Sequence, residues 1–195
     1  FRDVSSWYHI VFAFDTTDST ADNRLKIYVN GVQETSFATN NAIGEDADTG
    51  INANGLHTLG DGYGGFNGYF AEVNFIEGSQ LTPSSFGETK NGVWIPKKYT
   101  GSYGTNGFRL QFAQVGVGTA SSSTIGADTS GNNNHYTSSG IVASDCNMPD
   151  SPENNFATLN PLTAPAGGLE YLEGNLKITR GSVDAYSLAM STLAV

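Results

Sequence analysis

Three short segments of the chain gather side-chain oxygens of the kind that bind calcium. They are Asp15, Asp18, Asp22 and Asn23 in a polar stretch, Glu45, Asp46 and Asp48 in an acidic loop, and Asp128 with Asn132 in the sequence DTSGN. None has the D-x-[DN]-x-[DN]-G spacing of an EF-hand loop. The simpler interpretation is solvated loop charges for the first two segments and an Asx-turn at Asp128 for the third. We therefore expect no cofactor, and calcium is the one candidate, with Asp46, Asp48, Asp128 and Asn132 as its ligands.

Four tyrosines are candidates for stacking on sugar rings, because an aromatic face packs well against an apolar one. They are Tyr28, Tyr63, Tyr99 and Tyr103, which we expect on the outer faces of the fold. Single aromatic residues are common on protein surfaces, so an ordinary surface role is the alternative.

Motifs that would carry an enzymatic reaction are absent from the sequence. Residues 60–65 (GDGYGG) match the dinucleotide fingerprint G-x-G-x-x-G, but that motif needs a following helix and a strand is predicted here. The sequence has no G-x-S-x-G and no H-E-x-x-H motif. Glycoside hydrolysis needs two paired carboxylates, whereas Glu72 stands alone in its predicted strand. We expect that the chain is not an enzyme and that Glu72 is part of the scaffold.

The composition excludes further classes of function. A formal net charge of −10 repels nucleic acid and anionic membranes. No apolar run approaches the ~20 residues of a transmembrane helix. Cys146 is the only cysteine, so an internal disulfide is excluded and a small, partly buried apolar role is predicted. The 24 glycines lie among Asn, Ser and Thr, which indicates many short strands joined by tight turns.

Alternating apolar residues predict the regular strands. These cover residues 5–15, 24–30, 32–37, 65–78 and 108–112. The pair Asn30-Gly31 predicts a type I′ hairpin turn between the second and third strands. Residues 65–78 are predicted to be a core strand. Both faces of residues 5–15 are apolar, so we expect both to be covered.

Less regular structure is predicted elsewhere. Residues 56–59 are predicted to be a short strand, and residues 81–86 a single helical turn with Thr82 as N-cap and Pro83 as its first residue. Residues 91–103 are predicted to be an irregular apolar stretch, with Trp94 and Pro96 packed across a sheet edge. Residues 116–139 are predicted to be looped and to end in a short strand at 139–143. A proline-rich linker follows over residues 145–165, and a new unit begins at residue 169.

Several motifs together resemble the second half of a laminin-G or concanavalin A-like lectin domain. They are Trp7-Tyr8-His9 before a strand, LKIYVNG at residues 25–31, Leu59-Gly60, and GYFAEV at residues 68–73, which recur in that family in this order. The resemblance covers about residues 1–88 and implies a jelly-roll sandwich. The family's first strands precede such motifs, so we expect that the chain is a slice of a longer polypeptide.

A second resemblance begins beyond residue 80. The segments FGETKNGVWIPKKYTGSYGTNGFRLQF, DTSGNNNHYTSSGI and DSPENNFATLNP are similar to a run found in virion proteins of tailed phages. In those proteins a lectin-like domain is followed by this run and then by a SPRY-like sandwich, whose opening resembles Gly174-Asn175-Leu176. The resemblance implies a structural or receptor-binding virion component.

These observations combine into one expectation. The fold class is all-β, a partial concanavalin A-like jelly-roll sandwich with a loop-rich β extension. The domains are residues 1–88 (lectin-like), 89–165 (extension and linker) and 166–195 (start of a SPRY-like domain). The expected function is a tail fibre or appendage of a phage particle, located on the virion surface. Its expected partners are other virion subunits, copies of itself and a host glycan, without nucleic-acid binding or membrane insertion. The alternatives are a glycan-degrading enzyme with catalytic residues outside this slice, and a secreted carbohydrate-binding module.

Overall fold

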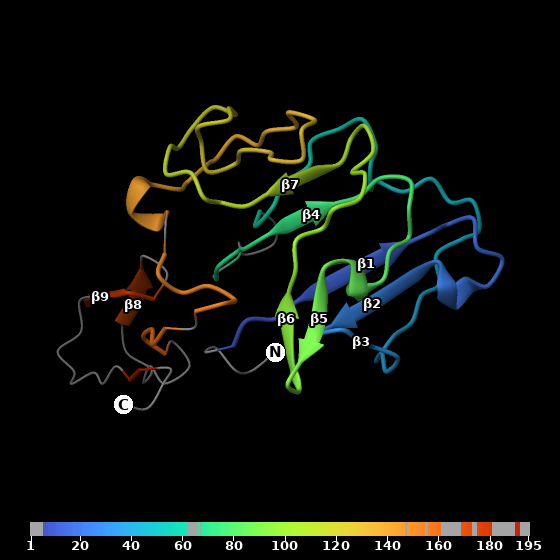
Figure 1. The fold of residues 1–195 in the computed structure, drawn as a ribbon, viewed down its shortest axis with the longest axis horizontal. Coiled ribbons are helices and arrows are strands. Elements are labelled where there is room, and N and C mark those ends of the chain that lie inside the picture. The colour runs from blue at the N-terminus through green and yellow to red at the C-terminus, as the bar shows by residue number, and fades with distance from the viewer. Residues whose placement is uncertain are drawn as a thin grey trace. The chain divides into compact units, whose positions relative to one another are not determined.

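The computed structural model describes residues 6–61, 66, 68–146, 148–154, 156–160, 169–172, 175–180 and 190–191. Across these residues the fold is all-β, as predicted, with short strands, three single-turn 3-10 helices and no α-helix (Figure 1). The strands are β1 (Ile10–Phe14), β2 (Leu25–Val29), β3 (Val32–Gln33), β4 (Val73–Phe75), β5 (Gly87–Lys90), β6 (Val93–Pro96), β7 (Phe108–Leu110), β8 (Leu169–Leu172) and β9 (Lys177–Arg180). The 3-10 helices are η1 (Ala21–Asn23), η2 (Pro83–Ser85) and η3 (Ala143–Asp145).

Residue contacts divide the chain into two compact units. Unit 1 comprises Phe1–Trp7, Thr58–Asn74 and Phe108–Val195, and unit 2 comprises Tyr8–His57 and Phe75–Gly107. Unit 2 contains the β1–β2–β3 sheet and the β5–β6 hairpin. Unit 1 contains β7 with most of its partner β4, and the β8–β9 hairpin. The predicted domain division at residues 88 and 165 stays a prediction.

The predicted hairpin at Asn30-Gly31 is confirmed. β2 pairs antiparallel with β1 and with β3 (Figure 1), and the turn between β2 and β3 has φ of 48° at Asn30 and 82° at Gly31. Both central residues of a type I′ turn need positive φ, which asparagine and glycine tolerate best. Asn30 also ties the turn to β1, because its Oδ1 accepts the N–H of His9 at 2.9 Å and its N–H donates to the His9 carbonyl at 2.8 Å.

The outer strands of this sheet are shorter than predicted, and one face of β1 is open. β1 begins at Ile10 rather than at residue 5, and β3 ends at Gln33 rather than at residue 37. The expectation that both faces of β1 are covered is wrong for the described residues. Ala13 is 4% exposed on one face, whereas Phe12 is 65% exposed on the other. Within the described residues no second layer lies over Phe12, so its ring remains in solvent.

An unpredicted hairpin replaces the irregular stretch expected after residue 90. β5 pairs with β6 across Asn91-Gly92, whose φ values of 51° and 80° match those of the first hairpin. Trp94 of β6 packs where glycine leaves room: a Cβ added to Gly31 or to Gly87 would lie 2.5 Å from a ring carbon of the indole. The imidazole of His9 lies beside the same indole, with ring centroids 5.5 Å apart. Trp94 therefore joins the two hairpins of unit 2.

The long strand predicted over residues 65–78 is wrong in extent. Only Val73–Phe75 is a strand, and it pairs with β7. The backbone of Glu72 has φ of 52°, in the left-handed region, so the extended conformation cannot continue through it. The preceding residues 62–65 and 67 lie outside the described part of the protein, and with them the GDGYGG turn.

The core of unit 1 is small and lies beside β7. Among the described residues of this unit, the most deeply buried side chains are Leu110 and Ala127, each 1% exposed. The loop over residues 116–139 is held by isolated bridges from Leu110 to Asp128 and from Gly116 to Thr124, in keeping with the predicted loop. Cys146 is buried as predicted, and burial, followed by the charge of Asp145, raises the pKa of its thiol.

Four further predictions can be compared with the described elements. The single helical turn at residues 81–86 is confirmed as η2, with Thr82 preceding Pro83. The short strands predicted at residues 56–59 and 139–143 are wrong: the first segment has no regular structure, and residue 143 begins η3. β8 and β9 pair as an antiparallel hairpin within unit 1, and the new unit predicted from residue 169 stays a prediction. No helix among the described residues is long and apolar enough to span a bilayer.

Candidate functional site

Two of the four candidate sugar-stacking tyrosines lie together in unit 2. Tyr99 and Tyr103 follow β6, and their ring centroids are 5.2 Å apart in an edge-to-face arrangement. On its other side Tyr99 contacts Phe86, with centroids also 5.2 Å apart. All three rings are half-buried, so each keeps part of its surface in solvent. We call Phe86, Tyr99 and Tyr103 the aromatic cluster.

The carboxylate of Glu77 holds the loop after β6, which carries Tyr99 and Tyr103. Its Oε2 accepts the backbone N–H of Thr105 at 2.7 Å and that of Asn106 at 2.9 Å, and its Oε1 accepts the Asn106 side-chain amide at 2.9 Å. The side chain of Asn52 donates to Oε1 as well, at 2.9 Å. These donors, the Asn106 backbone N–H foremost, lower the pKa of Glu77. The loop is therefore fixed by an ionised carboxylate at neutral pH.

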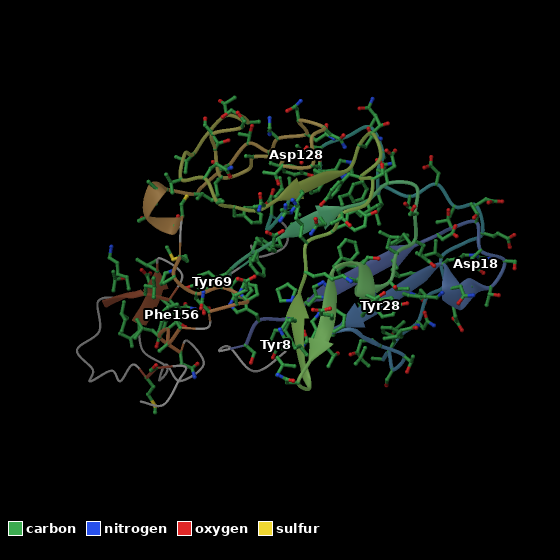
Figure 2. The ribbon with its side chains drawn as sticks, in the orientation of Figure 1. Tyr8, Asp18, Tyr28, Tyr69, Asp128 and Phe156 are labelled. Atoms are coloured by element: carbon green, nitrogen blue, oxygen red, sulfur yellow. The ribbon has the colours of Figure 1, made fainter. Side chains whose placement is uncertain are left out.

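The other two candidate tyrosines do not join the aromatic cluster in the described structure. Tyr28 lies on β2, opposite Val11 of β1 and Gln33 of β3 (Figure 2), and makes no recorded ring contact with the cluster among the described residues. Tyr63 lies outside the described residues. Of the four predicted positions, Tyr99 and Tyr103 alone are thus shown to share a surface.

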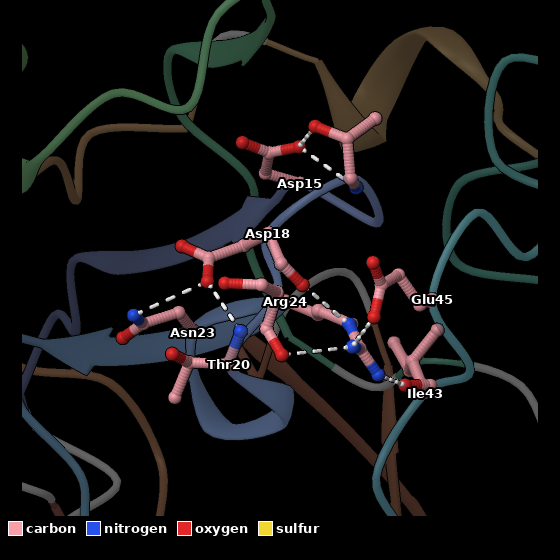
Figure 3. Close-up of polar contacts among 9 residues, drawn as sticks. Asp15, Asp18, Thr20, Asn23, Arg24, Ile43 and Glu45 are labelled. Atoms are coloured by element: carbon pink, nitrogen blue, oxygen red, sulfur yellow. Dashed lines mark hydrogen bonds and ion pairs between the residues drawn. The ribbon is translucent and has the colours of Figure 1, made fainter.

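The first acidic segment is organised around a buried arginine (Figure 3). Arg24 is 7% exposed, and its guanidinium donates to the carbonyls of Asp18 at 2.7 Å and Ile43 at 2.8 Å. It also pairs with the carboxylate of Glu45 at 2.9 Å. The Asp18 carboxylate accepts the Thr20 N–H at 2.7 Å, closing an Asx-type turn. A guanidinium therefore occupies the centre of the segment that could have held a cation.

The remaining carboxylates of the two acidic segments have local partners or face solvent. The hydroxyl and the N–H of Thr17 both donate to Asp15, and they lower the pKa of that carboxyl. Asp46 has φ of 52°, and its N–H donates to the Thr16 carbonyl, so its backbone closes the loop. Asp46 and Asp48 are both exposed. This geometry fits the solvated-charge interpretation, and their binding of calcium stays a prediction.

Asp128 forms the Asx-turn that is the predicted alternative to a metal site. Its Oδ1 accepts the Ser130 N–H at 2.8 Å, which is that turn, and the Arg109 N–H at 2.9 Å (Figure 2 shows Asp128 beside β7). Its Oδ2 accepts the Ser130 hydroxyl and the Asn134 N–H, each at 2.9 Å. Asn132 is exposed, and its N–H donates to the Ser130 hydroxyl.

No group of three or more His, Cys, Asp or Glu side chains among the described residues is placed to hold a metal ion. The carboxylate oxygens of Asp128 are directed at protein donors, and Asn132 lies on the outside of the same turn. Among the described residues, the geometry brings no further cluster of ligands to Asp128 and Asn132. Calcium binding by these two residues therefore stays a prediction.

The carboxylate of Glu72 pairs with a buried arginine. Arg109 donates from Nε to Oε2 at 2.9 Å and from Nη2 to Oε1 at 3.0 Å, a bidentate pair. The Arg109 side chain is 8% exposed and that of Glu72 is 40% exposed. The ion pair links the residue preceding β4 to β7, which is the scaffold role predicted for Glu72.

Comparison with known proteins matches the first part of the protein to a family. Residues 2–85 match the family model described as the concanavalin A-like lectin/glucanases superfamily. The match coincides with the region whose motifs resemble a laminin-G lectin domain, and it confirms the predicted fold class for that region. No curated protein and no solved structure matches the sequence. As its name states, the superfamily includes lectins and glucanases, so the match indicates carbohydrate binding at most.

Several residues that build these sites had no clear signal in the sequence. Glu77, Arg24 and Arg109 act on partners more than 18 residues away, and no local pattern marks such pairs. Trp94 is different, because Asn91-Gly92 before it is the same turn signal that was used at Asn30-Gly31. That signal predicts the β5–β6 hairpin, on whose second strand Trp94 lies.

Proposed function

We propose that this protein binds carbohydrate without transforming it. The observation that carries the proposal is the match of residues 2–85 to the concanavalin A-like lectin/glucanases superfamily. The aromatic cluster of unit 2 supplies a surface on which a sugar ring can stack, since Tyr99 and Tyr103 lie side by side and are partly exposed. Glu77 fixes the loop before any ligand arrives, which lowers the entropy lost on binding.

The proposal that the protein is not an enzyme rests on the ion pair that Glu72 makes. A glycosidase keeps one carboxylate free to attack or to activate water and a second to protonate the leaving oxygen. The carboxylate of Glu72 instead makes a bidentate pair with Arg109. Such a pair holds the side chain in place, which suits a scaffold.

We further propose that the protein is a virion component of a tailed phage, such as a tail fibre or appendage. Support comes from the likeness of the segments beyond residue 80 to virion proteins, and from the acidic, glycine-rich and asparagine-rich composition. In this proposal the protein lies on the particle surface, assembles with copies of itself and other virion subunits, and presents the lectin-like domain to a host glycan.

A glycan array tests carbohydrate binding, and single substitutions locate it. Tyr99→Ala removes the central ring of the aromatic cluster, and we expect the affinity for the best array ligand to fall about tenfold. Tyr99→Phe keeps the ring and should bind within about twofold of the parent protein. Tyr28→Ala is the matched control, because it removes a half-buried tyrosine outside the cluster, and it should leave the affinity unchanged.

The outcomes separate the rival functions. An array without any bound glycan would overturn carbohydrate binding, and equal losses for Tyr99→Ala and Tyr28→Ala would overturn the location. Release of reducing sugars from a bound polysaccharide would instead show a glycan-degrading enzyme. Mass spectrometry of purified phage particles tests the virion role: peptides of this protein should be present, and their absence from particles but presence in culture medium would indicate a secreted module.

A further inference from the structure

Five Asn-Gly dipeptides occur in the sequence, and an Asn-Gly dipeptide is chemically labile. They are Asn30-Gly31, Asn54-Gly55, Asn67-Gly68, Asn91-Gly92 and Asn106-Gly107. The glycine backbone nitrogen can attack the amide carbon of the asparagine side group, because glycine has no Cβ to hinder the approach. A bond forms between that nitrogen and Cγ, and the bond from Cγ to Nδ2 breaks. Ammonia is released, and the product is a cyclic succinimide. Water then opens the ring to aspartate or isoaspartate. The reaction consumes one water and needs no oxidant or reductant.

The structure holds two of these asparagines away from that reaction. The Asn30 side chain accepts the His9 N–H at 2.9 Å, and Gly31 is packed against the Trp94 indole. The Asn106 side chain donates to Glu77 at 2.9 Å, and its backbone N–H donates to the same carboxylate. Ring closure at either position would first break these hydrogen bonds.

Asn91 is exposed but conformationally fixed. It occupies the left-handed region with φ of 51° in the turn between β5 and β6, next to the Lys90–Val93 cross-strand pair. The glycine nitrogen reaches the asparagine side group only by rotation about the bond from Cα to the backbone carbonyl of Asn91. In a two-residue turn that rotation pulls the paired strands apart, so attack has to wait for local opening of the hairpin.

Asn54-Gly55 has none of these restraints. Both residues are exposed, a Cβ added to Gly55 would meet nothing within 4 Å, and φ of Asn54 lies outside the left-handed region. The nearest recorded hydrogen bonds belong to the preceding residue: the Ala53 N–H donates to Gly50 at 3.5 Å, and its carbonyl contacts the His57 ring at 2.9 Å. Among the described residues, the Asn54 side chain has no recorded hydrogen bond.

We propose that Asn54 deamidates spontaneously and that the structure favours it over the other described Asn-Gly asparagines. Water opens the resulting succinimide to aspartate or isoaspartate. The reaction adds one negative charge to a loop that already contains Glu45, Asp46 and Asp48. Where isoaspartate forms, the backbone between residues 54 and 55 is one carbon longer, and the loop changes its path. The modified protein is therefore distinguishable from the fresh one by charge and by backbone geometry.

Peptide mapping by mass spectrometry tests the proposal on the full-length protein. The native protein is incubated at mildly alkaline pH, where the attacking nitrogen loses its proton more readily, and conversion is followed at Asn30, Asn54, Asn91 and Asn106. Asn54 should convert at least about tenfold faster than each of the other three, because their reaction requires local opening. Conversion of any of these three at the rate of Asn54 or faster would overturn the proposal.

Two controls show whether structure causes the difference. In concentrated urea the four rates should come within a few-fold of one another, and a persistent preference for Asn54 would assign the selectivity to sequence and overturn the structural account. Gly55→Ala places a methyl group beside the attacking nitrogen, and this methyl group would contact no neighbouring atom within 4 Å. This variant should slow conversion at Asn54 about tenfold or more, and an unchanged rate would contradict attack by the backbone nitrogen.

Discussion

Asp128 shows how much local structure one carboxylate can hold in this protein. It is 7% exposed, and its two oxygens accept four hydrogen bonds from the backbones of Arg109, Ser130 and Asn134 and the hydroxyl of Ser130. Its own N–H donates to the His135 ring at 2.9 Å. A residue that the sequence marked as a metal-ligand candidate thus connects β7 to the loop that follows it.

Removal of this carboxylate should be costly. We expect Asp128→Ala to lower the free energy of unfolding by about 2–4 kcal/mol, since one buried and two partly buried N–H groups lose a charged acceptor at once. Urea unfolding at neutral pH, followed by circular dichroism, measures the change. Asp128→Asn keeps the shape and one acceptor oxygen and should cost less than the alanine variant. A loss below about 0.5 kcal/mol for alanine would show that the hydrogen bonds contribute little.

The same residue predicts a pH dependence. Burial acts to raise the pKa of Asp128, but the N–H groups of Arg109, Ser130 and Asn134 and the Ser130 hydroxyl outweigh it and lower the pKa below the ordinary 3.8. A lowered pKa in the folded state means that the stabilisation is complete above the unfolded value and is lost as pH falls through the folded value. The difference in unfolding free energy between the parent protein and Asp128→Asn should therefore be constant near neutrality and shrink below about pH 4. A difference that grows on acidification would contradict this sign.

At the scale of elements, the two Asn-Gly hairpins of unit 2 form a natural matched pair. Gly31 and Gly92 occupy the same turn position with φ of 82° and 80°. A Cβ at Gly31 would lie 2.5 Å from a ring carbon of the Trp94 indole, whereas a Cβ at Gly92 would meet nothing within 4 Å. An alanine would thus meet the same left-handed backbone strain at either position, whereas the packing around the two positions differs.

Alanine at these glycines should separate backbone strain from packing. Gly92→Ala introduces left-handed strain alone, so we expect about 1 kcal/mol of destabilisation. Gly31→Ala adds a clash with Trp94 and should cost about 1–3 kcal/mol more. Urea midpoints of the two variants provide the comparison. Equal losses would show that the Trp94 indole moves aside freely and does not lock the two hairpins together.

Local chemistry accounts for the part of the fold that the sequence predicts correctly. The Asn30-Gly31 turn and η2 after Thr82 each depend on residues that are neighbours in sequence. The strand expected over residues 65–78 failed because alternation continued through Glu72, where the backbone is left-handed. Glu72 is held there by Arg109, 37 residues away, and a tertiary ion pair of this kind leaves no trace in local periodicity.

The candidate site divides in the same way. Tyr99 and Tyr103 are candidates by residue type and by their expected place on the outer faces, and the structure brings their rings together. Glu77, which fixes their loop, bonds to residues 28 and 29 positions away and was not predicted. Tyr28 was proposed with the same argument but lies on β2, apart from the aromatic cluster. Residue chemistry therefore supplies the candidates, and long-range contacts determine which of them lie together.

At the scale of the whole molecule, the protein has a large excess of negative charge. The protein has 19 acidic and 9 basic residues, and two of the basic ones, Arg24 and Arg109, are buried in ion pairs. Exposed carboxylates therefore repel one another with few cations between them, which destabilises the compact state. Because these charges lie in solvent, salt screens them effectively, whereas the buried arginine pairs are screened much less.

Added salt should accordingly stabilise the protein. An increase in sodium chloride from about 10 mM to about 150 mM shortens the screening length to ~8 Å, and the thermal midpoint should rise by a few degrees. Differential scanning calorimetry measures the midpoint, and potassium chloride at equal ionic strength should give the same shift if screening is the cause. A lower midpoint in salt would indicate that attractive ion pairs outweigh the repulsion.

The position of Trp94 against Gly31 has a spectroscopic consequence. The protein has two tryptophans, and the division into compact units assigns Trp7 to unit 1 and Trp94 to unit 2. Each unit therefore contains its own intrinsic fluorophore. With Trp7→Phe the emission reports on unit 2, and with Trp94→Phe it reports on unit 1. Coincident denaturation curves from the two variants would define one cooperative molecule, and separate curves would define two that melt independently.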